Sequence, residues 1–379
     1  MQLCDSFHLL QQILPDLVIH PVNEMDLVRA QEHIDELAKP KGSLGRLEEI
    51  ARRLYAIYEG ATPLRVSPAI LYTIAADHGI ARQNVSAYPQ EVTRQMVENF
   101  LSGGGAINTL CSENRLTLCL VDGGCFGGPF PPNPLLLEHR LGEGTKDFSV
   151  ESAMTREQAI DGLGYGITLA REAAFDGAQC LATGEMGIGN TTSATALFSA
   201  ILHLDPCAIT GKGSGIGQEV LEKKISLIQK ALLVHKETIE KGDVIDVLAS
   251  LGGFEIAIMC GIMLGAAAEH LPCLVDGFIS AAAYLVGKCI CPALKEYVFL
   301  SHQSAEQGFS AIMSAMGEKP LLQLDMRLGE GTGAVLAYPL LRSSAALYNS
   351  MATFANAGVS RAFSLNPARQ TSDLQTPSE

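Results

Sequence analysis

Apolar residues recur at helical spacing near the start of the chain, from Met25 to Leu37 and again from Leu44 to about Tyr58. Pro40 lies between the two runs and ends the first, because proline lacks the backbone N–H that a helix interior needs. The pattern therefore predicts a helical hairpin.

Further along, short apolar runs of strand length alternate with segments long enough to be helices. The predicted strands are Ala69–Ala76, Leu116–Val121, Ala178–Ala182, Cys273–Val275 and Tyr297–Leu300. This alternation is typical of an α/β fold with a mostly parallel, doubly wound sheet flanked by helices. Because such sheets bind ligands beyond the carboxyl ends of their strands, we expect the chemistry in the turns that follow. These turns are Asp77-His78-Gly79, Asp122-Gly123-Gly124, Gly184-Glu185, Asp276-Gly277 and Ser301-His302.

The most apolar stretch of the chain, Ile256–Ala268, is too short to span a bilayer and predicts a buried helix instead of a membrane span. The N-terminus has no basic region followed by an apolar run, which predicts a cytoplasmic chain. The last residues, 366–379, are polar and are expected to be disordered.

Composition narrows the class of partner. The chain of 379 residues has 27 lysines and arginines against 41 aspartates and glutamates, a net charge of −14, which argues against nucleic-acid binding. A hydrophobic content of 47% excludes a disordered chain. The 10 cysteines lack the paired spacing of a zinc site, so we expect reduced thiols and no metal.

The segment Gly184–Thr192 follows a predicted strand and precedes the helical run Ser193–Leu202. Gly187 and Gly189 allow the backbone to approach a ligand, and Asn190 begins a set of donors at a helix N-terminus, where an anion is favoured. A phosphate fits this turn. The alternative is a tight strand-to-helix turn that needs glycine for its backbone alone.

A second glycine-rich segment, Thr210–Gly217, is not a P-loop, because Lys212 is followed by glycine. It is either a flexible loop or part of a ligand site. Downstream, Lys223 and Lys224 lie on a predicted helix, where one of them can turn toward a phosphate or both can be solvated.

Glu330 lies between two glycines, just before the apolar run Val335–Leu341. Burial against a ligand would raise the pKa of its carboxyl and suit it to accept a proton near neutrality, which makes Glu330 the candidate general base. The alternative is a surface-turn glutamate.

A further helix is predicted to begin at Pro89. Val92, Met96 and Phe100 share one of its faces, and Phe100 is expected in the core. Tyr88 and Met96 can instead form the walls of an apolar slot for a flat ring.

Seven motifs in this order resemble those of the nicotinate-nucleotide:dimethylbenzimidazole phosphoribosyltransferase family, which activates the lower-ligand base of cobalamin. The resemblance spans roughly residues 26 to 355. The motifs are Lys39–Glu48, Ala76–Gly79, Gly184–Thr192, Gly252–Glu255, Leu274–Phe278, Ser301–Glu306 and Met326–Gly333.

The resemblance implies an organisation into two domains and a homodimer. Residues 1–60 with about 340–365 would form a small helical domain, and residues 61–339 a large α/β domain that holds the active site. Phenol-using relatives can work as heterodimers, so a homologous partner subunit is the alternative.

The resemblance also implies a reaction that needs no cofactor. A ring nitrogen of the base attacks the anomeric carbon of β-nicotinate mononucleotide, and nicotinate leaves. Glu330 matches the general base and Glu185 a second active-site carboxylate. The positions that match phosphate and ribose contacts are Gly187, Ile188, Gly189, Asn190, Thr191, Lys224 and Ser304. The positions that match the base pocket are Tyr88, Gln95, Met96 and Leu328.

Three alternatives remain open at this point. The enzyme can prefer a purine or a phenol as acceptor, because some relatives carry smaller or hydrogen-bonding residues where this chain has Tyr88 and Met96. The second alternative is a non-catalytic homologue that senses the nucleotide. The third, suggested by the glycine loops alone, is an unrelated phosphate-binding hydrolase.

Overall fold

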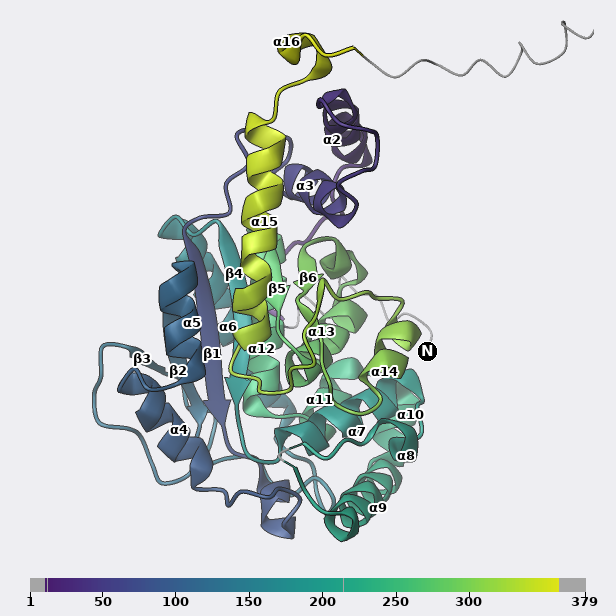
Figure 1. Cartoon of the computed structure of the whole chain (residues 1–379). Coiled ribbons are helices and arrows are strands. Elements are labelled where there is room, and N and C mark those ends of the chain that lie inside the picture. The colour runs from purple at the N-terminus through teal and green to yellow at the C-terminus, as the bar shows by residue number, and fades with distance from the viewer. Residues whose placement is uncertain (1–10, 12, 214, 361–379) are drawn as a thin grey trace, which may run out of the picture.

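Six parallel strands form one sheet at the centre of the molecule (Figure 1), in the order β3-β2-β1-β4-β5-β6. The computed structural model describes residues 11, 13–213 and 215–360. The strands are β1 (Ala69–Ala76), β2 (Thr117–Gly124), β3 (Leu136–Glu138), β4 (Cys180–Met186), β5 (Cys273–Val275) and β6 (Val298–Leu300). A second, two-stranded sheet pairs β7 (His302–Gln303) with β8 (Leu322–Gln323). The predicted α/β class and doubly wound sheet are confirmed.

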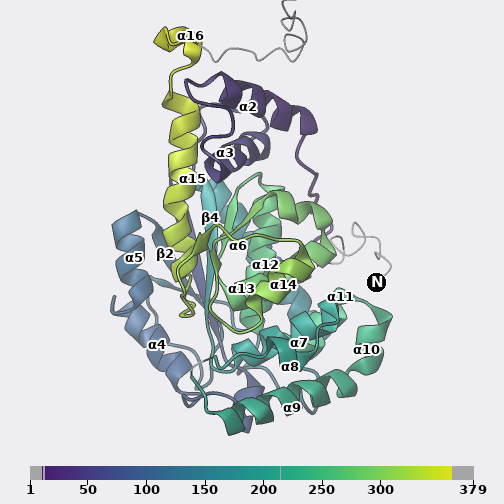
Figure 2. The same ribbon diagram turned by 45° about the vertical axis from the view of Figure 1, so that its right-hand side comes forward.

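Helices cover both faces of the large sheet (Figures 1 and 2): α5 and α15 pack on one face, and α6, α12 and α13 on the other. The longer helices are α4 (Val92–Leu101), α5 (Ala106–Asn114), α6 (Arg156–Phe175), α7 (Asn190–Leu202), α9 (Gln218–Val234), α11 (Val244–Leu251), α12 (Phe254–Ala268), α13 (Phe278–Ile290), α14 (Phe309–Met316) and α15 (Thr332–Ser350). The shorter ones are α8 (Pro206–Ile209), α10 (Lys236–Lys241), α16 (Phe354–Ala357) and the 3₁₀ turns Gly79–Gln83 and Pro292–Glu296.

The most apolar stretch of the sequence is the buried helix α12, as predicted. It lies between the sheet and α6, and its approach to α6 depends on glycine. A Cβ at Gly261 would overlap the carbonyl of Leu163, and a Cβ at Gly166 would overlap the carbonyl of Ile258. Among the described residues, no helix has the length and apolar character needed to cross a membrane.

The predicted helical hairpin is also confirmed, as α2 (Glu24–Glu36) and α3 (Arg46–Ile57). Both lie at one end of the molecule beside the C-terminal half of α15 (Figure 1), and α3 packs against α15. The division into two domains stays a prediction. Its expected boundary near residue 340 lies inside α15, which continues without a break to Ser350. The expected tail at 366–379 lies outside the described residues.

Two of the five predicted turns were wrong, because the strands continue through them. Asp122 and Gly124 belong to β2, where they pair with Ala75 and Ala76 of β1, and Glu185 belongs to β4, opposite Ile74. These strands extend beyond their apolar runs because backbone hydrogen bonds to the neighbouring strand do not require apolar side chains. The sequence pattern missed β3, β7 and β8, because each is short and, unlike β5 and β6, includes a polar residue.

Candidate active site

A cleft of about 560 Å³ opens where the strand order reverses between β1 and β4. Segments that follow β1, β4, β5 and β6 form its walls, so it lies at the carboxyl ends of the strands, where doubly wound sheets bind their ligands. Every residue predicted for the site lines this cleft except Gln95 and Lys224. The residues that do so are Tyr88, Met96, Glu185, Gly187, Ile188, Gly189, Asn190, Thr191, Ser304, Leu328 and Glu330.

The turn after β4 brings a helix N-terminus to the cleft. β4 ends at Met186, and α7 begins at Asn190 with Gly189 in the left-handed conformation, at a φ of 97°. The helix was predicted to begin at Ser193; it begins earlier because Asn190 and Thr191 already continue the helical turn. Because Gly187–Thr191 line the cleft, the N-terminus of α7 lies at its wall, an arrangement that favours an anion. The N–H groups of Asn190 and Thr192 are bonded to the carbonyls of Gly187 and Gly189, at 3.2 and 2.9 Å. Glycine is required at Gly187, where a Cβ would overlap the carbonyl of Ala76.

Lys224 of α9 lies directly behind this turn. Its side chain is buried, with 1% of the residue exposed, and its Nζ donates to Thr191 Oγ1 at 2.9 Å and to the carbonyl of Gly211 at 3.4 Å. Burial lowers the pKa of Lys224 to about 8, while the nearby Glu306 carboxylate opposes that shift. The alternative of a solvated lysine pair was wrong for Lys224 and holds for Lys223, which is exposed.

Glu185 and Glu330 approach each other from β4 and from the loop before α15. The backbone N–H of Glu330 donates to the carbonyl of Glu185 at 3.2 Å, and both side chains are buried. One carboxylate oxygen of Glu330 accepts the N–H of Ile107 at 3.2 Å, and Asn190 Nδ2 donates to Glu185 Oε2. The alternative of a surface-turn glutamate was therefore wrong.

Burial raises the pKa of both carboxyls. It raises that of Glu185 to about 8, with further contributions from the charges of Asp276, Glu255 and Glu330. The pKa of Glu330 is also raised, chiefly by burial, although the N–H of Ile107 opposes the shift. A carboxyl whose pKa is raised in this way can exchange a proton closer to neutral pH than an ordinary glutamate does. Among the described residues, no group of three or more histidine, cysteine, aspartate or glutamate side chains is arranged to hold a metal ion.

The predicted base pocket is partly assembled. Tyr88, Met96 and Leu328 line the mouth of the cleft, and Tyr88 and Leu328 are 56% and 57% exposed. Gln95 is exposed on α4 and does not line the cleft, because α4 turns its Val92–Met96 edge toward the ligand side. The helix begins at Val92, and not at Pro89 as predicted, since Pro89 first forms a turn in which its carbonyl accepts the N–H of Val92. Phe100 lies in the core, as expected.

Four further residues of the cleft with titratable side chains were not assigned a role from the sequence: Asp276, His302, Glu306 and Arg327. The sequence could have indicated Asp276 and His302 as site residues, because both lie in turns that follow predicted strands. Glu306 and Arg327 hold the second glycine-rich loop in place. Glu306 Oε2 accepts the N–H of Gly213 at 3.2 Å, and Arg327 Nη1 donates to the carbonyl of Gly213 at 2.8 Å.

Two other motifs meet beneath the Gly184–Thr192 turn without entering the cleft. His78 Nε2 lies 2.7 Å from Glu255 Oε1, and both side chains are fully buried. Gly253 allows this approach, since a Cβ there would overlap the His78 ring. The expected chemistry at Asp77-His78-Gly79 is therefore a supporting contact behind Gly187 and not part of the cleft wall.

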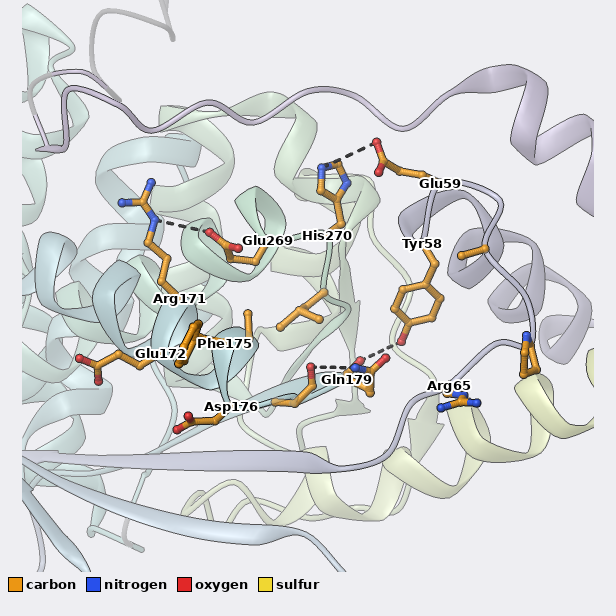
Figure 3. Close-up of a pocket in the computed structure, with 15 residues that line it drawn as sticks. Tyr58, Glu59, Arg65, Arg171, Glu172, Phe175, Asp176, Gln179, Glu269 and His270 are labelled. Carbon is orange, nitrogen blue, oxygen red and sulfur yellow. Dashed lines mark hydrogen bonds and ion pairs between the residues drawn. The ribbon is translucent and has the colours of Figure 1, made fainter.

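A larger cleft of about 990 Å³ lies at the opposite, amino-terminal ends of β1, β4 and β5 (Figure 3). Two pairs of its charged side chains lie close together: Arg171 is 3.5 Å from Glu269, and His270 is 3.9 Å from Glu59. It contains none of the predicted site residues. The smaller cleft is therefore the candidate active site.

Comparison with known proteins places the chain in a family. A family model described as phosphoribosyltransferase matches residues 19–359. A nicotinate-nucleotide–dimethylbenzimidazole phosphoribosyltransferase from Nitratidesulfovibrio vulgaris (strain DP4) is 51% identical over 91% of this chain and 96% of its own length. One of the same name from Chloroflexus aggregans is 46% identical over 90% of this chain and 96% of its own length.

A crystal structure of the enzyme of that name from Thermus thermophilus superposes with a TM-score of 0.83 at 41% identity, covering 90% of this chain and all of the other. These matches extend over both the large sheet and the helices at its end. The chain therefore belongs to the nicotinate-nucleotide–dimethylbenzimidazole phosphoribosyltransferase family.

Proposed function

We propose that the chain transfers the phosphoribosyl group of β-nicotinate mononucleotide to dimethylbenzimidazole, releasing nicotinate and forming the α-riboside 5′-phosphate. The observation that carries this proposal is the pairing of an anion-binding helix terminus with two buried carboxylates in one cleft. Phosphate binding at one end of the cleft would fix the ribose beside Glu185 and Glu330. The identity to relatives of that name supports the choice of substrates.

The proposed reaction needs one proton acceptor and a site for developing positive charge. A ring nitrogen of dimethylbenzimidazole forms a bond to the anomeric carbon as the bond to nicotinate breaks, and the bonding electrons leave with the nicotinate ring. The proton of the incoming ring passes to the Glu330 carboxylate. Its oxygen that accepts the Ile107 N–H is engaged, which leaves the other oxygen for this proton. Glu185 would stabilise the positive charge on the ribose while it is ionised.

The phosphate would bind the N-terminal amides of α7, with the side chains of Thr191 and Ser304 beside it. Lys224 would supply positive charge from behind Thr191. This arrangement explains how a chain with a net charge of −14 can hold a small anion. Backbone amides and one buried ammonium group make the electrostatic potential at the turn positive, even though the net charge of the whole chain is negative.

The substrate assignment is tested by incubating the protein with nicotinate mononucleotide and an equimolar mixture of dimethylbenzimidazole, adenine and p-cresol. Product masses identify the acceptor. We expect the dimethylbenzimidazole riboside phosphate to dominate, with one nicotinate released per product. Dominance of the adenine or cresol product would overturn the choice of acceptor. Nicotinate release without any acceptor would indicate a hydrolase, and absence of release would indicate a non-catalytic homologue.

Nucleotide affinity should fall as the pH rises through about 8, the pKa to which burial lowers Lys224. Below that pH the side chain is charged and attracts the phosphate; above it the neutral amine does not. The phosphate itself does not change charge there, because its second pKa is about 6. Calorimetric titration of nicotinate mononucleotide on both sides of pH 8 measures the effect.

Two variants make this test specific to Lys224. K224M should bind the nucleotide more weakly, with a smaller change of affinity through this pH range, because Glu185, whose pKa is also about 8, still titrates in the same cleft. K223M, which removes the exposed neighbour, should keep the wild-type profile. A pH dependence in K224M as large as that of the wild type would assign the effect to another group.

We also propose that the chain acts as a homodimer in the cytoplasm. The family resemblance supports both the dimer and a compartment in which the nucleotide substrate is made. Light scattering of the purified chain would detect the dimer. A monomer that acquires activity with a homologous subunit would indicate the heterodimer instead.

A further inference from the structure

The backbone that carries Glu330 has an unusual conformation. Gly329, Glu330 and Gly331 all have positive φ values, of 87°, 64° and 97°. The left-handed region is disfavoured for a glutamate, so the surrounding structure must hold it there. The contacts that do so identify the residues on which the position of this carboxylate depends.

Part of this support comes from β1 and β4 and acts on Glu330 itself. Thr73 Oγ1 donates to the carbonyl of Glu330 at 2.8 Å, and the N–H of Glu330 donates to the carbonyl of Glu185 at 3.2 Å. Gly184 lies directly against this peptide, where a Cβ would be 2.5 Å from the N of Gly331.

Within the loop, Thr332 Oγ1 donates to the carbonyl of Gly329 at 2.8 Å. Further support from a distant part of the chain comes from the side chain of Asp276, which directly follows β5. Its carboxylate accepts three backbone N–H groups: Gly331 at 3.1 Å on Oδ2, and Gly333 at 2.7 Å and Ala334 at 3.2 Å on Oδ1. The last two belong to the first turn of α15, whose N–H groups have no partner within the helix. With 2% of the residue exposed, Asp276 joins the end of a central strand to the residues just after Glu330.

We propose that Asp276 is the residue that positions Glu330 for proton transfer. This inference rests on the proposed function, in which Glu330 is the base. Asp276 holds the N-terminus of α15 on the carboxyl end of β5, and thereby fixes where the turn places the Glu330 carboxylate. Because the effectiveness of a general base depends on placement within hydrogen-bond reach, this support acts on the rate of the chemical step and not on nucleotide binding.

Asp276 also acts through its charge. The titratable groups around Glu330 are Glu185 from β4, Asp276 after β5 and His302 from β7, with Arg327 on the same loop. On the other sides, α5 presents the N–H of Ile107 and β1 the Thr73 hydroxyl. The charge of Asp276 contributes to the raised pKa of Glu330 and of Glu185. Removing that charge therefore lowers the pKa of Glu330.

The test is D276N, which keeps the shape of the side chain but places an amide nitrogen among N–H donors and removes the charge. We expect kcat to fall by about 10²-fold, the loss typical of a misplaced catalytic group, while KM for the nucleotide stays near its wild-type value. The acid limb of the pH profile of kcat should move to lower pH. Should D276N not accumulate as folded protein, D276S gives the same test, because it removes the charge and both acceptor oxygens without placing a second N–H donor beside the backbone N–H groups.

The matched control is D122N. Asp122 is also a buried aspartate at the carboxyl end of a strand, and it accepts the N–H groups of Gly124 and Cys125 at 2.9 Å each, but it lies outside the cleft. Its loss should lower thermal stability and leave the acid limb of kcat in place. Wild-type kcat in D276N, or a loss of activity that lies in KM for the nucleotide and not in kcat, would overturn the positioning role.

The variant E330Q separates this inference from the function on which it rests. Full turnover in E330Q would remove Glu330 as the base, and the inference with it. Loss of turnover in E330Q together with wild-type behaviour of D276N would leave the proposed function intact and reject the role of Asp276 alone.

Discussion

E330Q should lose about 10²- to 10⁴-fold in kcat, the usual contribution of a general base. The substitution keeps the size of the side chain and its bond to the N–H of Ile107, because the amide oxygen can still accept that hydrogen bond. It removes the basic oxygen that would take the proton from the incoming ring. Steady-state assays of nicotinate release with dimethylbenzimidazole as acceptor measure the loss.

The pH dependence of kcat gives a second, independent test of the role of Glu330. Because burial raises the pKa of Glu330, the wild-type rate should begin to fall, on acidification, at a higher pH than an ordinary glutamate would allow. E330Q has no titrating group at this position and should lose the part of the acid limb that is due to Glu330, while the part due to Glu185, whose pKa is about 8, stays. Its affinity for nicotinate mononucleotide, measured by calorimetry, should match the wild type. Near-normal turnover with the acid limb intact would assign the proton transfer to a different group.

G184A should lose both activity and stability. Gly184 lies in β4 against the peptide of Glu330 and Gly331, where a Cβ would overlap backbone atoms that cannot rotate away. The turn must therefore shift. We expect turnover to fall by about 10²-fold, because the base is displaced, and the free energy of unfolding to fall by about 1–3 kcal/mol, the range for an overpacked core. Assay of nicotinate release and denaturant unfolding give the two quantities.

G123A is the control for this prediction, since Gly123 also lies in a central strand of the sheet, in β2. A Cβ there would first meet the Cδ1 atom of Ile258 at 3.0 Å, the end of a side chain that can adjust. G123A should therefore keep wild-type turnover with a smaller loss of stability. If G184A and G123A behave alike, the close approach of β4 to the Glu330 turn is not what positions the base.

The sequence pattern predicted the elements that long-range contacts do not alter. β1 and β5 have the predicted bounds, and α12 is the buried helix that its apolar run indicated. It also predicted that the Gly184–Thr192 segment joins a strand to a helix, because all of its parts are contiguous in the chain. Strand ends such as Asp122 and Glu185 were missed, since backbone pairing with a neighbouring strand extends them, and pairing is a property of the sheet.

Some residues of the predicted site are neighbours in the sequence, whereas others come together only in the fold. The residues from Gly187 to Thr191 were found together because they belong to one turn. Asp276 was noted as the end of a strand, but nothing near it in the chain indicates that it bonds the residues after Glu330. Gln95 was placed in the base pocket, yet α4 is rotated so that Met96 lines the cleft and Gln95 faces solvent.

The sequence by itself determined the class of fold and the glycine turns, because hydrophobic period and residue chemistry are local properties. It offered Glu330 as a candidate base, and Glu185 as a second carboxylate only through the family resemblance. The tertiary structure decided that β1, β4 and β5 end side by side, and that their ends together hold the Glu330 turn in a conformation a glutamate disfavours. It also buried Lys224 behind Thr191. Burial and approach across the sheet set the pKa values and positions of these groups, and both depend on parts of the chain that are distant in sequence.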